Sequence, residues 1–289
     1  MQWGQIKTIF IISFLILNLF LVQQLMDKID QTNLETLDTT TLEEQLEAEG
    51  IEYTLPESGQ KETYVSAERY QLTEDDLTQL EEKLDTQNIA VFNEVIVGEF
   101  IEPLEVDIDD EMEQAIATIK ENIMYGDRYT FWDYYEEENV LLFFQNQNDR
   151  TVYFNESGVL IVVLDEDGHA IQYRQTILED VVKQSEEQTV IEPINALDVL
   201  YSNGNLVSQD EVTSMNIGYH TLVPLEDGVQ VLGVQVFVPT WEITINGEET
   251  YFVNAMEGQY IPNDEAEFVI KIKEHLKRQI EELNRSETE

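Results

Sequence analysis

The three histidines have the greatest potential for chemistry, because imidazole serves as a zinc ligand and as a general base near neutral pH. His169, His220 and His275 are spread along the chain, and none has a second ligand at the spacing of a zinc motif. The chain has no cysteine, which excludes a thiol nucleophile. It also lacks the G-x-S-x-G elbow, the H-E-x-x-H motif, the P-loop and the dinucleotide fingerprint. We therefore predict that the protein is not an enzyme and has no catalytic residues, no metal site and no cofactor.

Carboxylates are the second chemical resource, since the chain has 60 Asp and Glu against 15 Lys and Arg, a net charge of -45. Two carboxylates can hydrolyse a glycoside, but close pairs arise anywhere in so acidic a chain, so this enzyme class has little support. The segment from Asp165 to Gly168 resembles part of a calcium loop, yet His169 and Thr176 stand where the loop needs oxygen ligands, which predicts a turn. The charge excludes a nucleic-acid partner and a polybasic contact with anionic lipid.

The amino terminus carries an apolar run from Ile9 to Val22 that only Ser13 and Asn18 interrupt. With its flanks it makes a helix of about 21 residues and about 31 Å, enough to cross a hydrocarbon core of about 30 Å. A removed secretory signal of similar composition needs small residues at its cleavage site, and Ala, Gly, Ser and Cys are all absent between Ser13 and Ala48. We therefore expect a transmembrane helix at residues 8–26 in a single-pass protein of the cell membrane.

The orientation of this anchor follows from few charges. Lys7 and the amino terminus lie on the short side, whereas Lys28 on the long side is flanked by Asp27 and Asp30. The positive-inside rule then places residues 1–7 in the cytoplasm and the C-terminal region outside the membrane.

Asn18 lies near the middle of the apolar run, where an amide is unfavourable in lipid unless it is hydrogen-bonded. One interpretation is a contact with a helix of another membrane protein; the other is an amide that bonds its own backbone. The first interpretation predicts a partner-binding face made of Phe14, Leu15, Asn18, Leu21 and Val22.

The rest of the chain is rich enough in apolar residues to fold, with 42% hydrophobic and 10% aromatic residues. We predict an α+β fold in which the extracytoplasmic region holds two units, each a helix plus an antiparallel sheet. The expected divisions are a stalk or linker at residues 27–60, the first α+β unit at 61–180, the second at 181–262, and a C-terminal helix and tail at 263–289. An internal duplication and two unrelated α+β units both explain this repetition.

Capping residues and apolar periodicity predict the individual elements. Helices are expected to begin at Thr73, at Asp109, at Pro193 and at Asp264, the last with an apolar stripe that packs by one face. Apolar runs predict extended segments at 89–100, 104–108, 140–144, 151–154, 159–164, 170–175, 217–225, 229–239, 241–245 and 250–254. Asn246-Gly247 is the strongest hairpin signal among them.

Two stretches of the chain are distinctive. The first includes Trp3, Lys7-Thr8-Ile9-Phe10-Ile11, Phe14-Leu15, Leu17-Asn18 and Phe20-Leu21. The second includes Pro239-Thr240-Trp241, Tyr251-Phe252-Val253-Asn254-Ala255 and Gly258. Both stretches resemble the YycI (WalI) family of low-GC Gram-positive bacteria, and the length, the single amino-terminal span and the long external region are also similar to this family.

The resemblance implies a regulatory accessory protein of the WalK/WalR (YycG/YycF) two-component system, which acts in signal transduction and cell-wall homeostasis. It implies contacts, through transmembrane helices, with the sensor histidine kinase WalK (YycG) and a YycH-like partner, and an external region similar to the last two domains of YycH. It does not account for the acidity or for the C-terminal helix. The alternative function is an anchored extracytoplasmic binding module for a wall polymer or a peptide.

Overall fold

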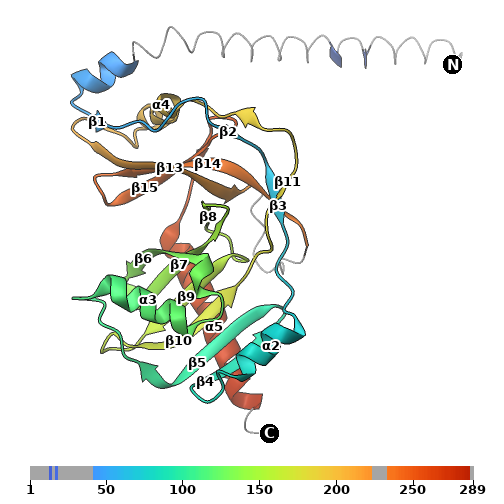
Figure 1. Cartoon of the computed structure of the whole chain (residues 1–289). Coiled ribbons are helices and arrows are strands. Elements are labelled where there is room, and N and C mark those ends of the chain that lie inside the picture. The colour runs from blue at the N-terminus through green and yellow to red at the C-terminus, as the bar shows by residue number, and fades with distance from the viewer. Residues whose placement is uncertain (1–12, 15–16, 19–41, 223–232, 287–289) are drawn as a thin grey trace, which may run out of the picture.

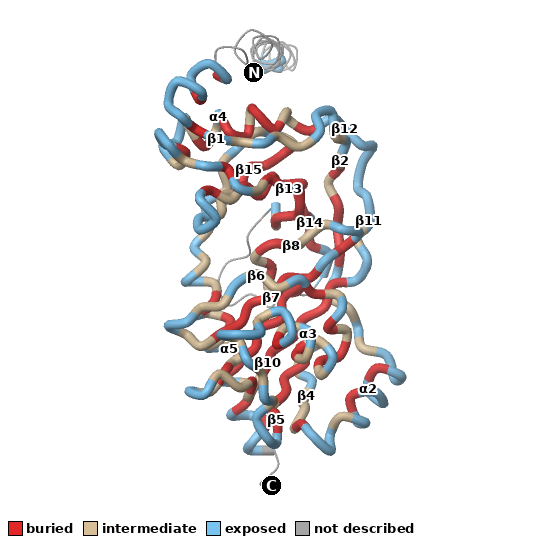
Figure 2. Tube along the Cα trace, turned by 60° about the vertical axis from the view of Figure 1, so that its left-hand side comes forward, coloured by how far each residue is buried: buried red, intermediate tan, exposed pale blue. Residues whose placement is uncertain are grey.

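The first sheet is antiparallel and is the core of the lower unit in Figure 1. The computed structural model describes residues 13–14, 17–18, 42–222 and 233–286. The strand order of the first sheet is β6 (Tyr129–Tyr135), β7 (Val140–Gln147), β9 (Val159–Leu164), β10 (Ala170–Thr176), β5 (Val95–Leu104) and β4 (Gln87–Phe92). Figure 2 shows that buried residues concentrate along these strands.

Helices cover both faces of the first sheet, which explains why β7 at residues 140–144 and the whole of β9 are apolar on both faces. Leu141 and Phe143 of β7 belong to the core that includes α3 (Met112–Asn122) and α2 (Glu74–Glu81). The alternate residues Val140, Leu142 and Phe144 belong to the core on the other face, which α5 (Glu265–Ser286) covers. The unit is therefore a three-layer arrangement of helix, sheet and helix.

The C-terminal helix α5 packs by one face, as the sequence predicts. Its buried residues are Val269, Ile272, Leu276, Ile280 and Leu283. Ion pairs with the acidic body of the first unit lie at the edges of this stripe: Lys271 is 2.9 Å from the carboxylate of Glu156, and Lys273 is 2.6 Å from that of Glu138. Lys273 also donates to the backbone oxygen of Glu138 at 2.7 Å.

The second sheet lies above the first and contains longer strands. Its main strands are β13 (Glu211–Thr221), β14 (Gln235–Ile245), β15 (Glu249–Asn254) and β16 (Tyr260–Ile261). The short strands β1 (Glu52–Tyr53), β3 (Val65–Ala67) and β11 (Val182–Lys183) extend it, and β2 (Lys61–Glu62) pairs separately with β12 (Gln188–Thr189). The helix α4 (Pro193–Asn203) covers its upper face (Figure 1).

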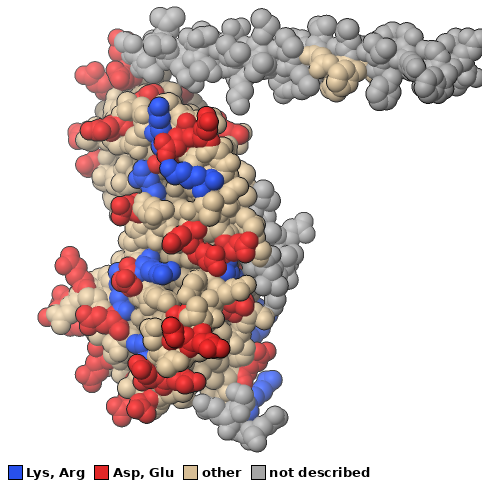
Figure 3. Space-filling model, turned by 45° about the vertical axis from the view of Figure 1, so that its right-hand side comes forward, with Lys and Arg blue, Asp and Glu red and all other residues tan. Residues whose placement is uncertain are grey.

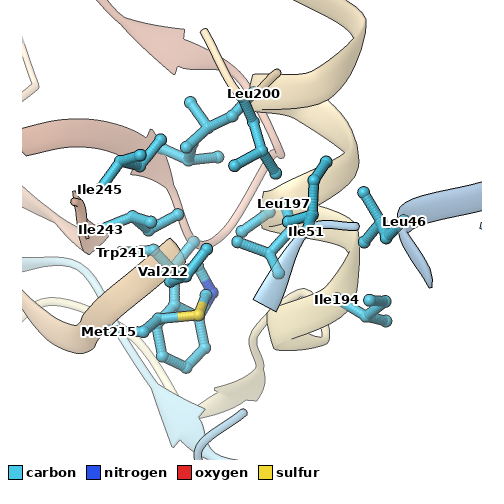
Figure 4. Packing of buried hydrophobic residues seen from close by; sticks show 14 of the residues in the cluster. Leu46, Ile51, Ile194, Leu197, Leu200, Val212, Met215, Trp241, Ile243 and Ile245 are labelled. Carbon is cyan, nitrogen blue, oxygen red and sulfur yellow. The ribbon is translucent and has the colours of Figure 1, made fainter. Parts of the chain in front are cut away.

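Residues from distant parts of the chain meet in the core beneath α4. Figure 4 shows Leu197 and Leu200 of α4 facing Ile243 of β14, with Leu46 and Ile51 beside them. Leu46 belongs to a helical segment at residues 42–48 within the region expected to form a stalk, and it is fully buried. The amino-terminal side of the described region is thus part of the second core.

A short strand joins the two sheets into one continuous sheet. β8 (Arg150–Tyr153) follows β7 through a tight turn and pairs with it, and then pairs in parallel with Tyr219 and His220 of β13. Beside it, Asn155 donates hydrogen bonds to Thr221 and to Gln235 at 2.8 Å. Backbone pairing and side-chain hydrogen bonds therefore both connect the units.

The α+β class, the helices predicted at Thr73, Pro193 and Asp264, and the turn at Asp165 are confirmed. The helix predicted to begin at Asp109 is present, but it begins at Met112. The Asn246-Gly247 hairpin is also confirmed, with positive φ at both residues. The segments predicted at 217–225 and 229–239 extend into residues 223–232, which lie outside the described residues.

Two predicted extended segments differ from the structure. Residues 89–100 fold back at Asn93 and Glu94, both with positive φ, so that they form a hairpin between β4 and β5. β5 continues through Pro103 and ends at Leu104, so the strand predicted at 104–108 is wrong. Gly98 lies inside β5 opposite Tyr173 of β10, and glycine is needed there because a Cβ would lie 2.2 Å from the Tyr173 ring.

The sequence predicts one extended segment that ends at Pro239 and another that begins at Trp241. In the structure Pro239 lies inside the single strand β14. Its carbonyl accepts a hydrogen bond from Ala255 at 2.9 Å, so its missing N–H faces the same edge of β14. On that edge the pairing with β3 ends at Phe237, and the pairing with β15 begins at Thr240. Proline is tolerated because no partner strand needs its donor.

The capping box of α2 gives a stability prediction. Asp76 accepts hydrogen bonds from Tyr125 and Tyr70, and from the backbone and hydroxyl of Thr73. Burial alone would raise the pKa of Asp76, but these hydrogen bonds outweigh it and lower the pKa to about 2. Because the pKa is depressed, the stabilisation is present above the unfolded value of about 3.9 and is lost as the pH falls through about 2.

We expect Asp76→Ala to lower the free energy of unfolding by about 1–3 kcal/mol at pH 7, through the lost cap and the unpaired hydroxyls. Urea unfolding of both proteins at several pH values measures this. The difference should shrink as the pH falls below about 4. A difference that is constant down to pH 2 contradicts the assignment. Asp75→Ala, at an exposed position of the same turn, is the control.

Candidate partner-binding surfaces

The edge strand β6 carries an aromatic side chain that contacts both units. The Trp132 ring lies 5.3 Å from Phe144, 5.5 Å from Tyr153 and 6.2 Å from Phe252, measured between ring centroids. Phe144 belongs to the first sheet and Phe252 to the second, with Tyr153 on the connecting strand β8. Trp132 therefore lies at the centre of the packing between the sheets.

Two adjoining clefts open beside this contact, one of about 580 Å³ and one of about 300 Å³. Both are lined by Trp132 and by Glu242 of β14. Glu242 is only 7% exposed, and its carboxylate accepts hydrogen bonds from Asn216 at 3.0 Å and from Thr244 at 2.9 Å. The floor of the site is thus an oriented carboxylate beside an indole ring.

The wall of the larger cleft is acidic. Its carboxylates come from β6, from β14, from the hairpin between β14 and β15, and from the first turn of α5: Asp133, Glu242, Glu248, Glu249 and Glu265. Lys and Arg are absent from this lining. An enclosed surface of one charge concentrates counter-ions, so the cleft favours a cationic group. An ammonium or guanidinium group also gains from the face of an indole.

Glu265, the first residue of α5, lines this cleft. Its carboxylate accepts a hydrogen bond from the hydroxyl of Tyr135 at 2.7 Å. Burial raises the pKa of Glu265, while hydrogen bonds from Tyr135 and Trp132 act in the opposite direction. The Glu265 carboxyl group therefore ionises at a higher pH than that of a free glutamate.

A second groove, of about 1090 Å³, lies on the first unit beside α3. It is lined by residues 105–111, by α3 and by the turn from Asp165 to His169. His169 is 3.8 Å from the carboxylate of Asp165 and lines this groove, half of whose lining residues are Asp or Glu. Figure 3 shows that acidic side chains are spread over both units and outnumber the basic ones on the face in view.

The three histidines lie apart, as their sequence positions indicate. His220 is buried on β13, His275 lies 4.0 Å from Glu156 on α5, and His169 lies in its turn. Within the described ranges, no group of three His, Asp or Glu side chains is arranged to hold a metal ion. Burial lowers the pKa of His220 and of His275.

The predicted anchor face is described only at two of its positions. Phe14 and Asn18 are helical and exposed, Phe14 at 60%. Leu15, Leu21 and Val22 lie outside the described residues. Of the helices in the described part of the chain, none has the length and hydropathy that crossing a bilayer requires. The transmembrane helix expected at residues 8–26 therefore stays a prediction.

Trp132, Glu242 and the strand β6 were not predicted from the sequence. The signal for β6 is its composition, because aromatic residues favour strands and five of its seven residues are Tyr, Phe or Trp. A bulge at Phe131 and Asp133 breaks the alternation that would have identified it. No local signal marks Glu242, which differs from other glutamates only in its tertiary environment.

Comparison with known proteins gives one family. The family described as YycI protein matches residues 29–256, most of the chain. No curated protein sequence gives a significant match.

Several solved structures are distantly similar. An uncharacterized protein from Eubacterium rectale has 12% identity and a TM-score of 0.39, over 71% of this chain and 86% of that one. The C-terminal domain of YpeB from Bacillus megaterium has 12% identity and a TM-score of 0.38, over 66% and 99%. YycH from Bacillus subtilis has 11% identity and a TM-score of 0.38, over 71% of this chain and 57% of YycH.

Proposed function

Because the chain belongs to the YycI family, a family of regulatory accessory proteins of the WalK two-component system, we propose that it is a membrane-anchored regulator of the sensor histidine kinase WalK (YycG). It is non-enzymatic and acts on a kinase that controls cell-wall homeostasis. The family match over residues 29–256 is the observation that carries this proposal.

The anchor at residues 8–26 contacts transmembrane helices of the kinase and of a YycH-like partner. Asn18 supplies a side-chain hydrogen bond at this contact, because an amide in hydrocarbon is relieved by a partner on a neighbouring helix. Phe14, Leu15, Leu21 and Val22 pack around it. The amino terminus is cytoplasmic and the C-terminal domain is extracytoplasmic, in line with the charges that flank the apolar run.

Regulation requires that the complex favour one signalling state of the kinase, since equal binding to two states shifts neither. The two units of the external region are connected by β8 and by the core beneath α5. A change in the position of one unit therefore affects the position of the other. The external region thereby influences which signalling state of the kinase the anchor favours.

The acidic cleft between the sheets favours a second candidate function. Its indole ring, its buried carboxylate and its lack of Lys and Arg suit a cationic peptide segment. An anchored extracytoplasmic binding module for such a peptide therefore remains the alternative, and the same features make an anionic wall polymer a poor ligand for this cleft.

The Asn18→Leu variant tests the regulatory proposal. We expect recovery of the kinase in a membrane pull-down to fall, with a loss of affinity of about 3- to 30-fold if one interhelical hydrogen bond of about 0.6–2 kcal/mol is removed. Leu17→Ala, off the predicted face, is the matched control and should bind normally. The external domain should unfold at the same urea concentration in all three proteins.

Normal recovery of the kinase by Asn18→Leu removes Asn18 from the mechanism. If the full-length wild-type protein recovers neither the kinase nor a YycH-like protein, the regulatory proposal fails. A peptide-binding function alone then becomes the better account.

A further inference from the structure

Basic side chains gather at one place in this acidic chain, where α5 crosses the first sheet beside the turn between β8 and β9. We call Arg69, Glu156, Arg174, Lys271 and His275 the junction cluster. Its residues come from different parts of the fold: Arg69 follows β3 of the second sheet, Arg174 lies in β10 of the first, and Lys271 lies on α5. With only 15 Lys and Arg against 60 Asp and Glu, such a concentration is unusual for the chain.

Arg174 is buried beneath α5. In β10 it pairs with Val97 of β5 and with Ile161 of β9, and both of these residues belong to the core that α5 covers. Because residues opposite each other in adjacent strands share a face, the Arg174 side chain points into the same layer. It is 4% exposed, and its Nε and Nη1 have no hydrogen-bond partner.

Arg69 is the second guanidinium of the junction cluster and is more exposed. Its Nη2 donates to the hydroxyl of Ser157 at 2.9 Å and its Nη1 to the backbone oxygen of Asn93 at 3.3 Å, whereas its buried Nε has no partner. Burial lowers the pKa of Arg174 to about 10, and the charge of Arg69 lowers it in the same direction. The two like charges therefore oppose each other in a region of low solvent access.

The carboxylate of Glu156 only partly compensates this charge. It lies 2.9 Å from Lys271 and 4.0 Å from His275, at the exposed edge of the cluster, where all three side chains are about 30% exposed. A buried charged donor without a partner lowers the stability of the folded state, because its lost hydration is not replaced. Apolar residues of similar size would avoid this cost, so stability alone does not explain Arg174.

We propose that the junction cluster binds a small oxyanion of the phosphate or carboxylate class, with the free N–H groups of Arg174 and Arg69 as donors. The planar guanidinium is suited to this, because its donors match two oxygens of one anion. The anion is held between the first sheet and the strand that leads from the second sheet, beneath the edge of α5. Its binding therefore stabilises one arrangement of the two units, independently of whether the protein regulates a kinase.

Thermal unfolding of the full-length protein tests the proposal, with inorganic phosphate as the probe. Sodium chloride of equal ionic strength is the reference, because salt alone screens the net charge of -45 and stabilises the fold. We expect the unfolding midpoint to be about 2–4 °C higher in saturating phosphate than in chloride, the shift that about 1 kcal/mol gives a domain of this size. Sodium acetate, tested in the same way, distinguishes a carboxylate ligand from a phosphate.

Arg174→Met keeps the length of the side chain and removes its charge. It should abolish the extra gain in phosphate while unfolding at an equal or higher temperature than wild type in chloride, because the unsatisfied donors are gone. Lys183→Met removes the same charge from an exposed position and should keep the full gain. Arg69→Met, at the more exposed end of the site, should reduce the gain and guards against misfolding of the first variant.

The proposal is overturned if wild type gains no more from phosphate or acetate than from chloride. It is also overturned if Arg174→Met and Arg69→Met both keep the gain, which would mean an adventitious ion only. A loss of the gain in Lys183→Met assigns the effect to net charge and rejects the site.

Discussion

Leu276→Ala in α5 is expected to lower the free energy of unfolding by about 2–5 kcal/mol, a large part of the stability of a domain. Leu276 is 1% exposed and packs into the core between α5 and the first sheet, where Val97, Phe144 and Ile161 are fully buried. Truncation removes apolar contacts and leaves a cavity that the surrounding strands and helix fill only partly. Urea unfolding followed by circular dichroism gives the value.

Ile270→Ala is the matched control for this experiment. Ile270 lies on the same helix, but it is 44% exposed. Its truncation should change stability by less than about 0.5 kcal/mol. Equal effects of the two substitutions would mean that α5 does not pack on the sheet in solution. A large effect of Leu276 alone shows that the C-terminal helix is part of the fold of the first unit.

Trp132→Ala is expected to lower the free energy of unfolding by about 3–5 kcal/mol and to weaken the contact between the sheets. Its ring contacts Phe144 and Phe154 of the first unit and Phe252 of the second, at centroid distances of 5.3–6.2 Å. Aromatic pairs of this kind contribute beyond the area they bury. Because Trp132 lies between the units, its removal should reduce the cooperativity of unfolding as well as its midpoint.

Urea unfolding observed by two probes measures this loss of cooperativity. Near-ultraviolet circular dichroism reports the aromatic packing, and far-ultraviolet circular dichroism reports the strands and helices. The two transitions should coincide in wild type and separate in Trp132→Ala. Thr130→Ala, at an exposed position of the same strand, should leave them together. Coincident transitions in Trp132→Ala would contradict a role in coupling the units.

The acidity of the chain makes its stability depend on the salt concentration. Charges of one sign repel each other, so the folded state becomes more stable as salt screens them. The described ion pairs of α5 are partly exposed, with Lys271 at 30% and Lys273 at 34%, and such pairs contribute about 0–1 kcal/mol each. Apolar packing therefore holds α5 in place, while the ion pairs select its position along the sheet.

The local pattern of the sequence was sufficient for the α+β class and for the helices, because capping residues and apolar periodicity act within a few residues. Thr73 and Asp76 form a capping box on their own segment, and the stripe of α5 is visible without knowing its partner. The same holds for the Asn246-Gly247 turn, whose backbone conformation few other residues adopt.

Only the tertiary structure decided which surfaces these elements cover. The stripe of α5 fits any apolar face, and it is the first sheet that receives it. Pro239 remains inside a strand because its neighbours on one edge leave a gap there, and Arg174 lies beneath a helix almost a hundred residues away. Burial, strand pairing and the meeting of distant charges depend on long-range contacts, which no short pattern encodes.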